Sequence, residues 1–450
     1  MGFMDHREIT ELLKKEIAPA TGCTGPTTYA LASSCCARYM TARAERISVA
    51  VSPAYLKMGF GVATPGTTRT GIEIATAAGL TGGDPDAGMQ VLKGITKEQL
   101  LEAEKIADSG IISVRGEPGR RGVYVRTEIV TANETVSAVV ENTHDGISSV
   151  CLDGEPVFEA PAVYEEKRIE DEPERLTLED VLSYAEEASF EEIGFLLDGY
   201  RMNVELAEDA LKNEFGLGSG RALLLRSFAG REVPNNIWDD PMKYLPTDLH
   251  ARAGILVAAA SDARMGGSKK PAMAAMGDGN QGITMLIPIG VAGELMGKSE
   301  FVTARAMALG SLMLFYVKKN IGRAAATCLC AIAASAGAAA GYGFLLGLDE
   351  PAVKAAVKNV MSALAGMICD GAKNGCALKM HVACMSALSF TELAGYGVET
   401  GFHDGISDTT LEDAVRNITG IANETMDKTD ACIVDVILSK TERDLGRIEE

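Results

Sequence analysis

The chain has 450 residues, of which 47% are hydrophobic and 23% charged, a balance typical of a soluble globular protein with two or three domains. Its net charge of −20 leaves no basic surplus to neutralise phosphates, so we expect no nucleic-acid partner. The first residues, MGFMDHREITELLKKE, show no signal or transit pattern, which predicts a cytoplasmic protein. In that compartment the ten cysteines are expected to be free thiols, metal ligands or catalytic groups rather than disulfides.

The first third of the chain mixes helical and strand patterns. Helical periodicity covers residues 7–42. From about 45 to 165, the segments RISVAVSP, GVYVRTEIVTA and ETVSAVVENT alternate and are rich in Val, Ile and Thr, as half-buried strands are. A helix over TKEQLLEAEKIADSG lies between them. We therefore predict an α+β domain over residues 1–165.

A charged segment with two prolines, EAPAVYEEKRIEDEPERLTLED, predicts a linker near residues 160–178. Helical periodicity dominates from there to the end, so we predict an all-α domain over residues 175–450. The uncharged stretch between Arg323 and Asp349 is long enough to span a membrane. Its Ala and Gly content, and the lack of a flanking aromatic belt, favour a tightly packed core helix instead, so we expect no membrane partner.

Cys23 stands at the start of a predicted helix, in the stretch PATGCTGP. Pro26 suits the first position of a helix, which places Cys23 just before it or at its N-cap. Exposed N–H groups and the positive end of the helix dipole stabilise anions there, thiolates included. Cys23 is therefore a reactive thiolate, a metal ligand or a small buried residue, and the pattern alone leaves the three open.

Five of the six cysteines in the predicted helical domain lie in two short segments. TCLC supplies Cys328 and Cys330, which point to different sides of their helix, so at most one of them faces a given site. GMICDGAKNGCALKMHVAC supplies Cys369, Cys376 and Cys384. The absence of a C-x-x-C pair from the sequence argues against a zinc ribbon or a ferredoxin loop. An iron–sulfur cluster held from separated segments fits the spacing, and simple burial of free thiols is the alternative.

Two glycine-rich segments carry polar side chains that suit a small anionic or zwitterionic ligand. GDGNQGIT places Asp278, Asn280 and Gln281 among glycines, where amides and bare backbone N–H groups can bind a carboxylate. In GFGVATPGTTRTG, Thr67 and Arg69 can hold an anion in the same way. A polar interhelical loop and a capped strand-to-helix turn are the respective alternatives.

Histidine is scarce, with five in the chain, which disfavours a His-rich metal centre. His144, in ENTHDGI at a strand end, is the best placed for a general acid or base. A surface histidine, or one satisfied in the core, is the alternative.

Taken together, these segments resemble the L-cysteine desulfidase family, which is related to the iron–sulfur L-serine dehydratases and holds both halves of the dehydratase in one chain. PATGCTGP is similar to the family's PA-x-GCTEP motif. TPGTTRTG, HDGI, SDARMGG, GNQGIT and MICDGAKNGCALK match further family segments in the same order, over most of the chain. The resemblance equates residues 1–165 with the dehydratase beta part and residues 175–450 with its cluster-binding alpha part.

The resemblance implies an oxygen-sensitive [4Fe–4S] cluster and an α,β-elimination on a small β-substituted amino acid, without pyridoxal phosphate. The most direct reaction converts L-cysteine to pyruvate, ammonia and sulfide. Three thiolates leave one iron open as a Lewis acid for the β-thiol or hydroxyl. L-Serine or L-threonine deamination and a non-catalytic amino-acid-binding relative are the alternatives. Partners are expected to be the small amino-acid substrate and a second copy of the chain in a homodimer.

Carried over residue by residue, the resemblance implies cluster ligands at Cys23, Cys330 and Cys369, with Cys328 as competitor of Cys330 and Cys376 as competitor of Cys23. If Cys376 binds iron, Cys23 is free to act as the base. The implied catalytic and substrate-binding residues are Cys23, His144, Lys373, Thr24, Thr67, Asp278, Asn280 and Gln281.

Two positions depart from the family pattern. Gly25 stands where the family has Glu, and MGDG stands where it has S-G-S, which adds Asp278. Both positions are expected to face the substrate, so the reaction class is more firmly implied than the amino acid that reacts.

Overall fold

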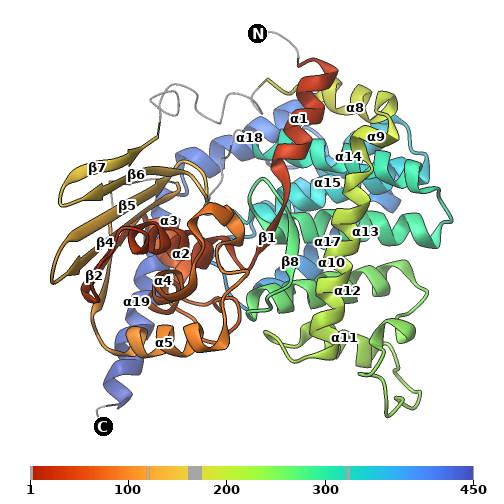
Figure 1. Ribbon diagram of the computed structural model, residues 1–450. Helices are drawn as coiled ribbons and strands as arrows, with labels where there is room; N and C mark the ends of the chain where they lie inside the picture. The colour runs from red at the N-terminus through yellow and green to blue at the C-terminus, as the bar shows by residue number, and fades with distance from the viewer. Residues whose placement is uncertain are drawn as a thin grey trace.

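The computed structural model describes residues 4–117, 119–120, 122–160, 175–319, 321 and 325–448. It has a sheet-containing part, formed mainly by the N-terminal region, and a helical part formed mainly by the C-terminal region (Figure 1). This mixed architecture agrees in outline with the predicted fold class. The predicted linker near 160–178 lies mostly outside the described residues, so the boundary between the two domains stays a prediction.

The sheet-containing part is a six-stranded sheet with the strand order β3-β2-β4-β5-β6-β7. All neighbouring strands are antiparallel except β2 and β3. The strands are β2 (Ala44–Val51), β3 (Ile112–Gly116), β4 (Tyr124–Thr131), β5 (Thr135–Glu141), β6 (Ile147–Leu152) and β7 (Glu155–Glu159). Alternate residues of β4 are buried, as the Val, Ile and Thr pattern predicts.

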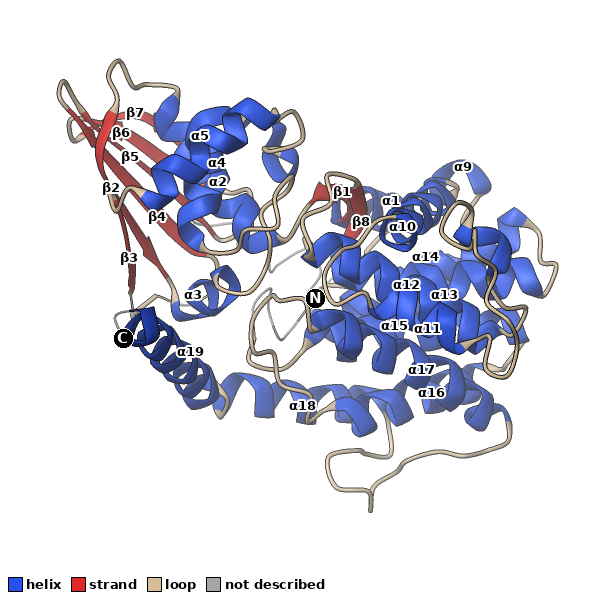
Figure 2. Cartoon of the chain, turned by 90° about the horizontal axis from the view of Figure 1, so that it is seen from below, coloured by secondary structure: helices blue, strands red, loops and turns tan. Residues whose placement is uncertain are grey.

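Helices cover one face of this sheet (Figure 2). Helix α2 packs on β4 and β5, α4 packs on α2, and α5 packs on α4. A short helix, α3, follows β2 and faces the helical part. The elements of this layer are α2 (Thr24–Ala37), α3 (Pro53–Gly59), α4 (Ile72–Gly82), η1 (Pro85–Gln90) and α5 (Lys97–Asp108).

The helical part is arranged around α15 (Leu329–Leu346), which packs against α13, α14, α16 and α17. Its N-terminus, at Cys328, points to the seam between the two parts. The remaining elements are α8 (Leu178–Glu187), α9 (Phe190–Ile193), α10 (Phe195–Lys212), α11 (Ser219–Arg226), η2 (Pro241–Tyr244), α12 (Leu249–Met265), α13 (Gly279–Leu295), α14 (Glu300–Lys318), α16 (Glu350–Leu364), α17 (Cys376–Gly395) and α18 (Leu411–Glu424).

Each end of the chain packs against the part of the protein that the other end of the sequence mainly forms. Helix α1 (His6–Glu16) belongs to the core of the helical part, and β1 (Ile17–Thr21) pairs antiparallel with β8 (Pro271–Ala275). At the other end, α19 (Asp427–Ile448) returns to α3. The expectation of an all-helical second part therefore needs correction, because it contains β8. The sequence of β8, PAMAA, lacks alternation and β-branched residues, and four of its five residues are buried.

Two helices, α14 and α15, are long and apolar enough to cross a membrane, but 78% and 83% of their apolar windows are buried inside the protein. This burial agrees with the prediction of a core helix between Arg323 and Asp349. The two helices touch through glycines: a Cβ at Gly337 would lie 2.4 Å from the carbonyl oxygen of Gly310. Glycine at these positions lets the two backbones approach closely.

We expect Gly337→Ala to lower the free energy of unfolding by about 1–3 kcal/mol, because the added methyl group forces α14 and α15 apart. Gly420→Ala on α18 is the matched control, because no described heavy atom lies within 4 Å of its Cβ position. Urea unfolding of both variants measures the difference. Equal effects would contradict the close helix contact.

Candidate functional site

A cavity of about 70 Å³, partly open to solvent, lies where the sheet-containing part meets the helical part. Its walls bring together cysteines that are far apart in the sequence. All ten cysteines of the chain are free thiols. Those that line the cavity are Cys23, Cys328, Cys330, Cys369 and Cys376. The structure therefore places every predicted cluster ligand, and both competitors, at one site. The expectation that at most one of Cys328 and Cys330 faces a given site is wrong, because Cys328 is the N-cap of α15 rather than part of the helical turn that carries Cys330.

Backbone hydrogen bonds join the two loops that carry most of these thiols. The N–H of Cys328 donates to the carbonyl of Met367 over 2.8 Å, and the N–H of Cys369 donates to the carbonyl of Ala326 over 2.6 Å. Cys328 is the N-cap of α15, and Cys376 is the first residue of α17. The positions of Cys328, Cys369 and Cys376 thus depend on the starts of α15 and α17 and on the backbone hydrogen bonds between the two loops.

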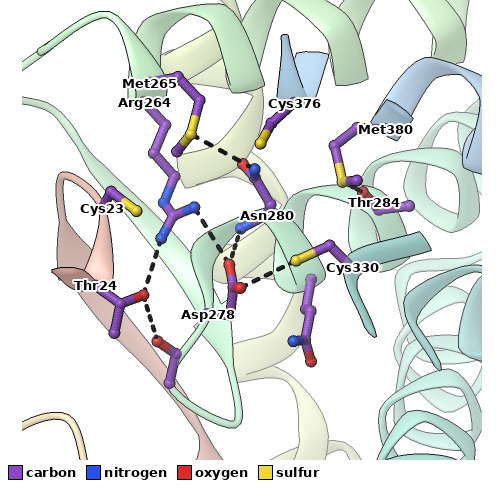
Figure 3. Close-up of polar contacts among 12 residues, drawn as sticks. Cys23, Thr24, Arg264, Met265, Asp278, Asn280, Thr284, Cys330, Cys376 and Met380 are labelled. Atoms are coloured by element: carbon purple, nitrogen blue, oxygen red, sulfur yellow. Dashed lines mark hydrogen bonds and ion pairs between the residues drawn. The ribbon is translucent and has the colours of Figure 1, made fainter. Parts of the chain in front are cut away.

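Cys23 enters the cavity from the sheet-containing part, as the N-cap of α2. It is buried beside Arg264, and the side chain of Thr24 accepts a hydrogen bond from Nη2 of Arg264 over 3.4 Å (Figure 3). Burial raises the pKa of the Cys23 thiol, and the Arg264 guanidinium opposes only part of that rise. The predicted helix start at Cys23 is confirmed, and it places the thiol beside the guanidinium group of Arg264.

Arg264 and Asp278 form a buried ion pair at the centre of the site. Nη1 of Arg264 lies 3.2 Å from Oδ1 of Asp278, and their side chains are 3% and 23% exposed. The thiol of Cys330 donates to Oδ2 of Asp278 over 3.0 Å (Figure 3). Burial raises the pKa of the Asp278 carboxyl, but Arg264 and Cys330 outweigh it and hold that pKa below its usual range. Asp278 is therefore an anion whose accessible surface faces the cavity.

The thiols of Cys328 and Cys330 are chemically unequal. The neighbouring thiol of Cys330 lowers the pKa of the Cys328 thiol, against the effect of burial. The thiol of Cys328 beside it, burial and the charge of Asp278 raise the pKa of Cys330 well above its ordinary value. Burial also raises the pKa of Cys369, and it raises that of Cys376 to about 12.

Two buried polar atoms on the cavity wall lack partners. No described residue donates a hydrogen bond to Oδ1 of Asn280, and the hydroxyl of Thr327 likewise has no partner among the described residues. Gln281, next to Asn280 on α13, accepts a hydrogen bond from Nζ of Lys318 over 3.1 Å. A buried polar atom without a partner is costly, so these atoms indicate where a polar ligand group would bind.

Four predicted site residues are not among those that line the cavity. Thr24 is one of them, and its hydroxyl accepts a hydrogen bond from the cavity residue Arg264. His144 is buried and its Nδ1 is hydrogen-bonded to the hydroxyl of Tyr55 on α3. Nζ of Lys373 pairs with Asp370. Thr67 donates to a carboxylate oxygen of Glu104 over 3.2 Å. These side chains support the loops and helices around the site rather than facing its interior.

Several cavity residues were not singled out from the sequence. Lys57 and Met58 on α3, and Lys379 and Met380 on α17, line the cavity beside the thiols. The only sequence signal for Lys57 is a lone cation in the otherwise apolar stretch PAYLKMG. Such a cation is usually solvated, so its burial could not be predicted from the pattern.

The thiol set fits a cluster better than a single metal ion. Within the described residues, no three His, Cys, Asp or Glu side chains are close enough to enclose one ion. In a four-iron cluster each thiolate binds its own iron, so the ligands surround a larger volume. Five free thiols around one cavity, with Cys328 and Cys369 on backbone-paired loops, fit that requirement.

We expect Asp278→Asn to lower the free energy of unfolding of the metal-free protein by about 3 kcal/mol, because it leaves the buried Arg264 without a counter-charge. The control is Asp198→Asn, which breaks a surface ion pair with Arg201 and should have little effect. Chemical unfolding under reducing conditions measures both. A small effect at Asp278 would contradict the central role of this pair.

Comparison with known proteins identifies one family. The family model for the serine dehydratase alpha chain matches residues 86–435. A UPF0597 protein from Clostridioides difficile is 34% identical over 436 residues, covering 95% of this chain and 98% of the relative. UPF0597 proteins from Yersinia enterocolitica and Porphyromonas gingivalis are each 33% identical, covering 95% and 98% of this chain and 96% and 100% of their own. The similarity thus extends over nearly the whole length of these proteins.

Proposed function

The chain belongs to the serine dehydratase alpha chain family, and from this premise we propose that it is an iron–sulfur-dependent lyase that performs α,β-elimination on a small β-substituted L-amino acid. One observation carries the proposal: free thiols share a single cavity with the buried Arg264–Asp278 pair and the amide oxygen of Asn280, which has no partner among the described residues. Thiols suit a cluster, and fixed opposite charges suit a zwitterion. We further propose a cytoplasmic location, because free thiols require reducing conditions.

We assign the cluster to Cys328, Cys369 and Cys376. Cys328 is preferred to Cys330 because it is the N-cap of α15 on the loop that pairs with the loop of Cys369, whereas the thiol of Cys330 donates a hydrogen bond to Asp278. Cys376 is preferred to Cys23 because it follows Cys369 closely in the helical part, at the start of α17, whereas Cys23 enters the cavity from the sheet-containing part. When bound, a [4Fe–4S] cluster with one open iron supplies a Lewis acid for the β-substituent of the substrate. This chemistry needs no pyridoxal phosphate.

Cys23 is then free to move the α-proton. Its sulfur lies at the N-terminus of α2 and beside Arg264, two features that stabilise the thiolate. Because burial raises the pKa of this thiol, the thiolate is a strong base once formed. In the proposed step, Sγ of Cys23 takes the α-proton, and the electron pair of the Cα–H bond forms the double bond as the β-substituent leaves. The resulting enamine hydrolyses to the keto acid and ammonia without further help.

The substrate's charged groups match the polar end of the cavity. Oδ1 of Asn280 can accept a hydrogen bond from the α-ammonium group, which the nearby anion of Asp278 also attracts. The guanidinium of Arg264 and the hydroxyl of Thr24 lie on the side where an α-carboxylate would be held. In this arrangement the chain fixes the substrate's orientation before the proton moves.

L-Cysteine is the proposed first substrate, and L-serine or L-threonine is the second candidate. The two departures from the family pattern bear on this choice. A Cβ at Gly25 would lie 3.1 Å from the carbonyl oxygen of Met58, so a residue with a side chain there would press on a cavity wall. Asp278 places a carboxylate where the family has a hydroxyl. We expect Asp278→Ser to shift the ratio of kcat/KM between cysteine and serine, measured by keto-acid release.

Anaerobic reconstitution with iron and sulfide tests the lyase activity. We expect a brown protein with thiolate-to-iron charge-transfer absorbance that releases pyruvate from L-cysteine or L-serine. Removal of iron with a chelator should abolish turnover, and added pyridoxal phosphate should not restore it. A cluster-loaded protein that binds amino acids by calorimetry but releases no keto acid would favour a non-catalytic binding role instead.

Single Cys→Ser variants separate the ligands from the base. We expect loss of iron and of charge-transfer absorbance at positions 328, 369 and 376. Cys23→Ser should keep the cluster but lower turnover by about 10²–10⁴-fold, because the base is lost. Cys384→Ser, a buried cysteine of the helical core, is the matched control. Loss of the cluster in Cys23→Ser would instead make Cys23 a ligand.

A further inference from the structure

Lys57 is a buried cation of the sheet-containing part whose side chain contacts the helical part. It lies on α3 of the sheet-containing part, its side chain is 2% exposed, and it lines the cavity. A buried ammonium group is costly unless it is paired and hydrogen-bonded. The groups that bind Nζ of Lys57 therefore identify the contacts that compensate for burying its charge.

The three partners of Lys57 come from three different segments. Nζ donates to the carbonyl of Cys369 over 2.9 Å and to the carbonyl of Ala325 over 3.4 Å. It pairs with Oδ1 of Asp430 over 2.5 Å. The two carbonyls belong to the loops that carry Cys369 and Cys328. One ammonium group thus joins both cysteine loops and a carboxylate from α19.

Close backbone packing reinforces this junction. Gly371, two residues after Cys369, has a φ of +93°, and a Cβ there would lie 2.1 Å from the carbonyl oxygen of Lys57. Slightly farther along, Gly61 and Lys373 form an isolated parallel bridge. The loop from Cys369 to Lys373 therefore rests directly on the segment that follows α3. Only a residue without a side chain fits at Gly371.

Asp430 reaches Lys57 because α19 leaves the helical part and runs beneath α3 (Figures 1 and 2). The side chain of Asp430 is 19% exposed. One turn further along α19, Val434 packs against the core of the sheet-containing part. The C-terminal helix therefore supplies the counter-charge of Lys57 only when it is docked.

We propose that Lys57 and Asp430 are positioning residues for the thiol site. The ion pair holds the two cysteine loops in the arrangement that binds metal, and it makes metal affinity depend on docking of the C-terminal helix. This inference rests on the proposed function in one respect, namely that the thiols bind metal. Neither residue is assigned a role in the chemical step.

Titration of the metal-free protein with Cd²⁺, under anaerobic reducing conditions, tests the inference. Cd²⁺ is redox-inert and binds to pairs of thiolates, so it does not need three ligands around one ion, and its binding is followed by ultraviolet charge-transfer absorbance. We expect Lys57→Met to weaken Cd²⁺ binding by about 10- to 100-fold, the usual effect of losing a residue that orients metal ligands. Asp430→Asn should weaken it in the same direction, because Lys57 loses its counter-charge.

The double variant Lys57→Met/Asp430→Asn separates positioning from general stability. Removing one member of a buried pair leaves an unpaired partner, whereas removing both restores much of the thermal stability. We expect the double variant to regain its unfolding temperature but not its affinity for Cd²⁺. Wild-type affinity in the stable double variant would overturn the inference.

Two controls and one comparison complete the experiment. Lys354→Met breaks an ion pair on α16, and Asp435→Asn changes an exposed carboxylate of α19; both should bind Cd²⁺ as the wild type does. A wild type without cadmium–thiolate absorbance would overturn the inference, whereas reconstitution with iron and sulfide decides the proposed function separately. Coupling between Lys57 and Cd²⁺ affinity in a protein that shows no lyase activity would support the inference and overturn the lyase alone.

Discussion

The buried ion pair between Arg264 and Asp278 is the contact on which the arrangement of the cavity depends. Arg264, near the end of α12, also donates to the backbone carbonyl of Gly22 over 3.1 Å, which places the start of α2. Asp278 caps α13 and accepts the proton of Cys330 on α15. Four helices thus meet at one pair of opposite charges. The pair is stable only because each charge compensates the other away from bulk water.

The sequence predicts the segments of the site better than the side chains within them. Spacing and motif order identify the two cysteine loops and the start of α2, because these depend on local turn and cap chemistry. The choice between Cys328 and Cys330 depends on which of the two thiols contacts Asp278. That is a tertiary contact, which the local sequence does not determine. The same limit applies to Lys57, whose burial requires a carboxylate 373 residues away. Strand β8 escapes prediction because its pairing with β1, rather than its residues, makes it a strand.

The roles predicted for His144, Lys373 and Thr67 stay predictions, but the structure suggests a common reason for their place in the motifs. Each binds a neighbour that supports a cavity-forming segment: Tyr55 on α3, Asp370 in the cysteine loop and Glu104 on α5. A sequence motif can therefore contain residues that position the cavity segments as well as residues that react.

The composition of α15 has a consequence for the metal-free protein. Its central run, from Ala331 to Gly343, consists of alanine and glycine apart from Ile332, Ser335 and Tyr342. Alanine and glycine have no rotamers to exchange, so this helix cannot adjust by side-chain rearrangement. Cys328, the N-cap of this helix, is therefore held in a fixed position by a tightly packed helix of the core. For the proposed cluster, the thiol of Cys328 would already be in place before iron binds, so ordering this residue would cost little conformational entropy.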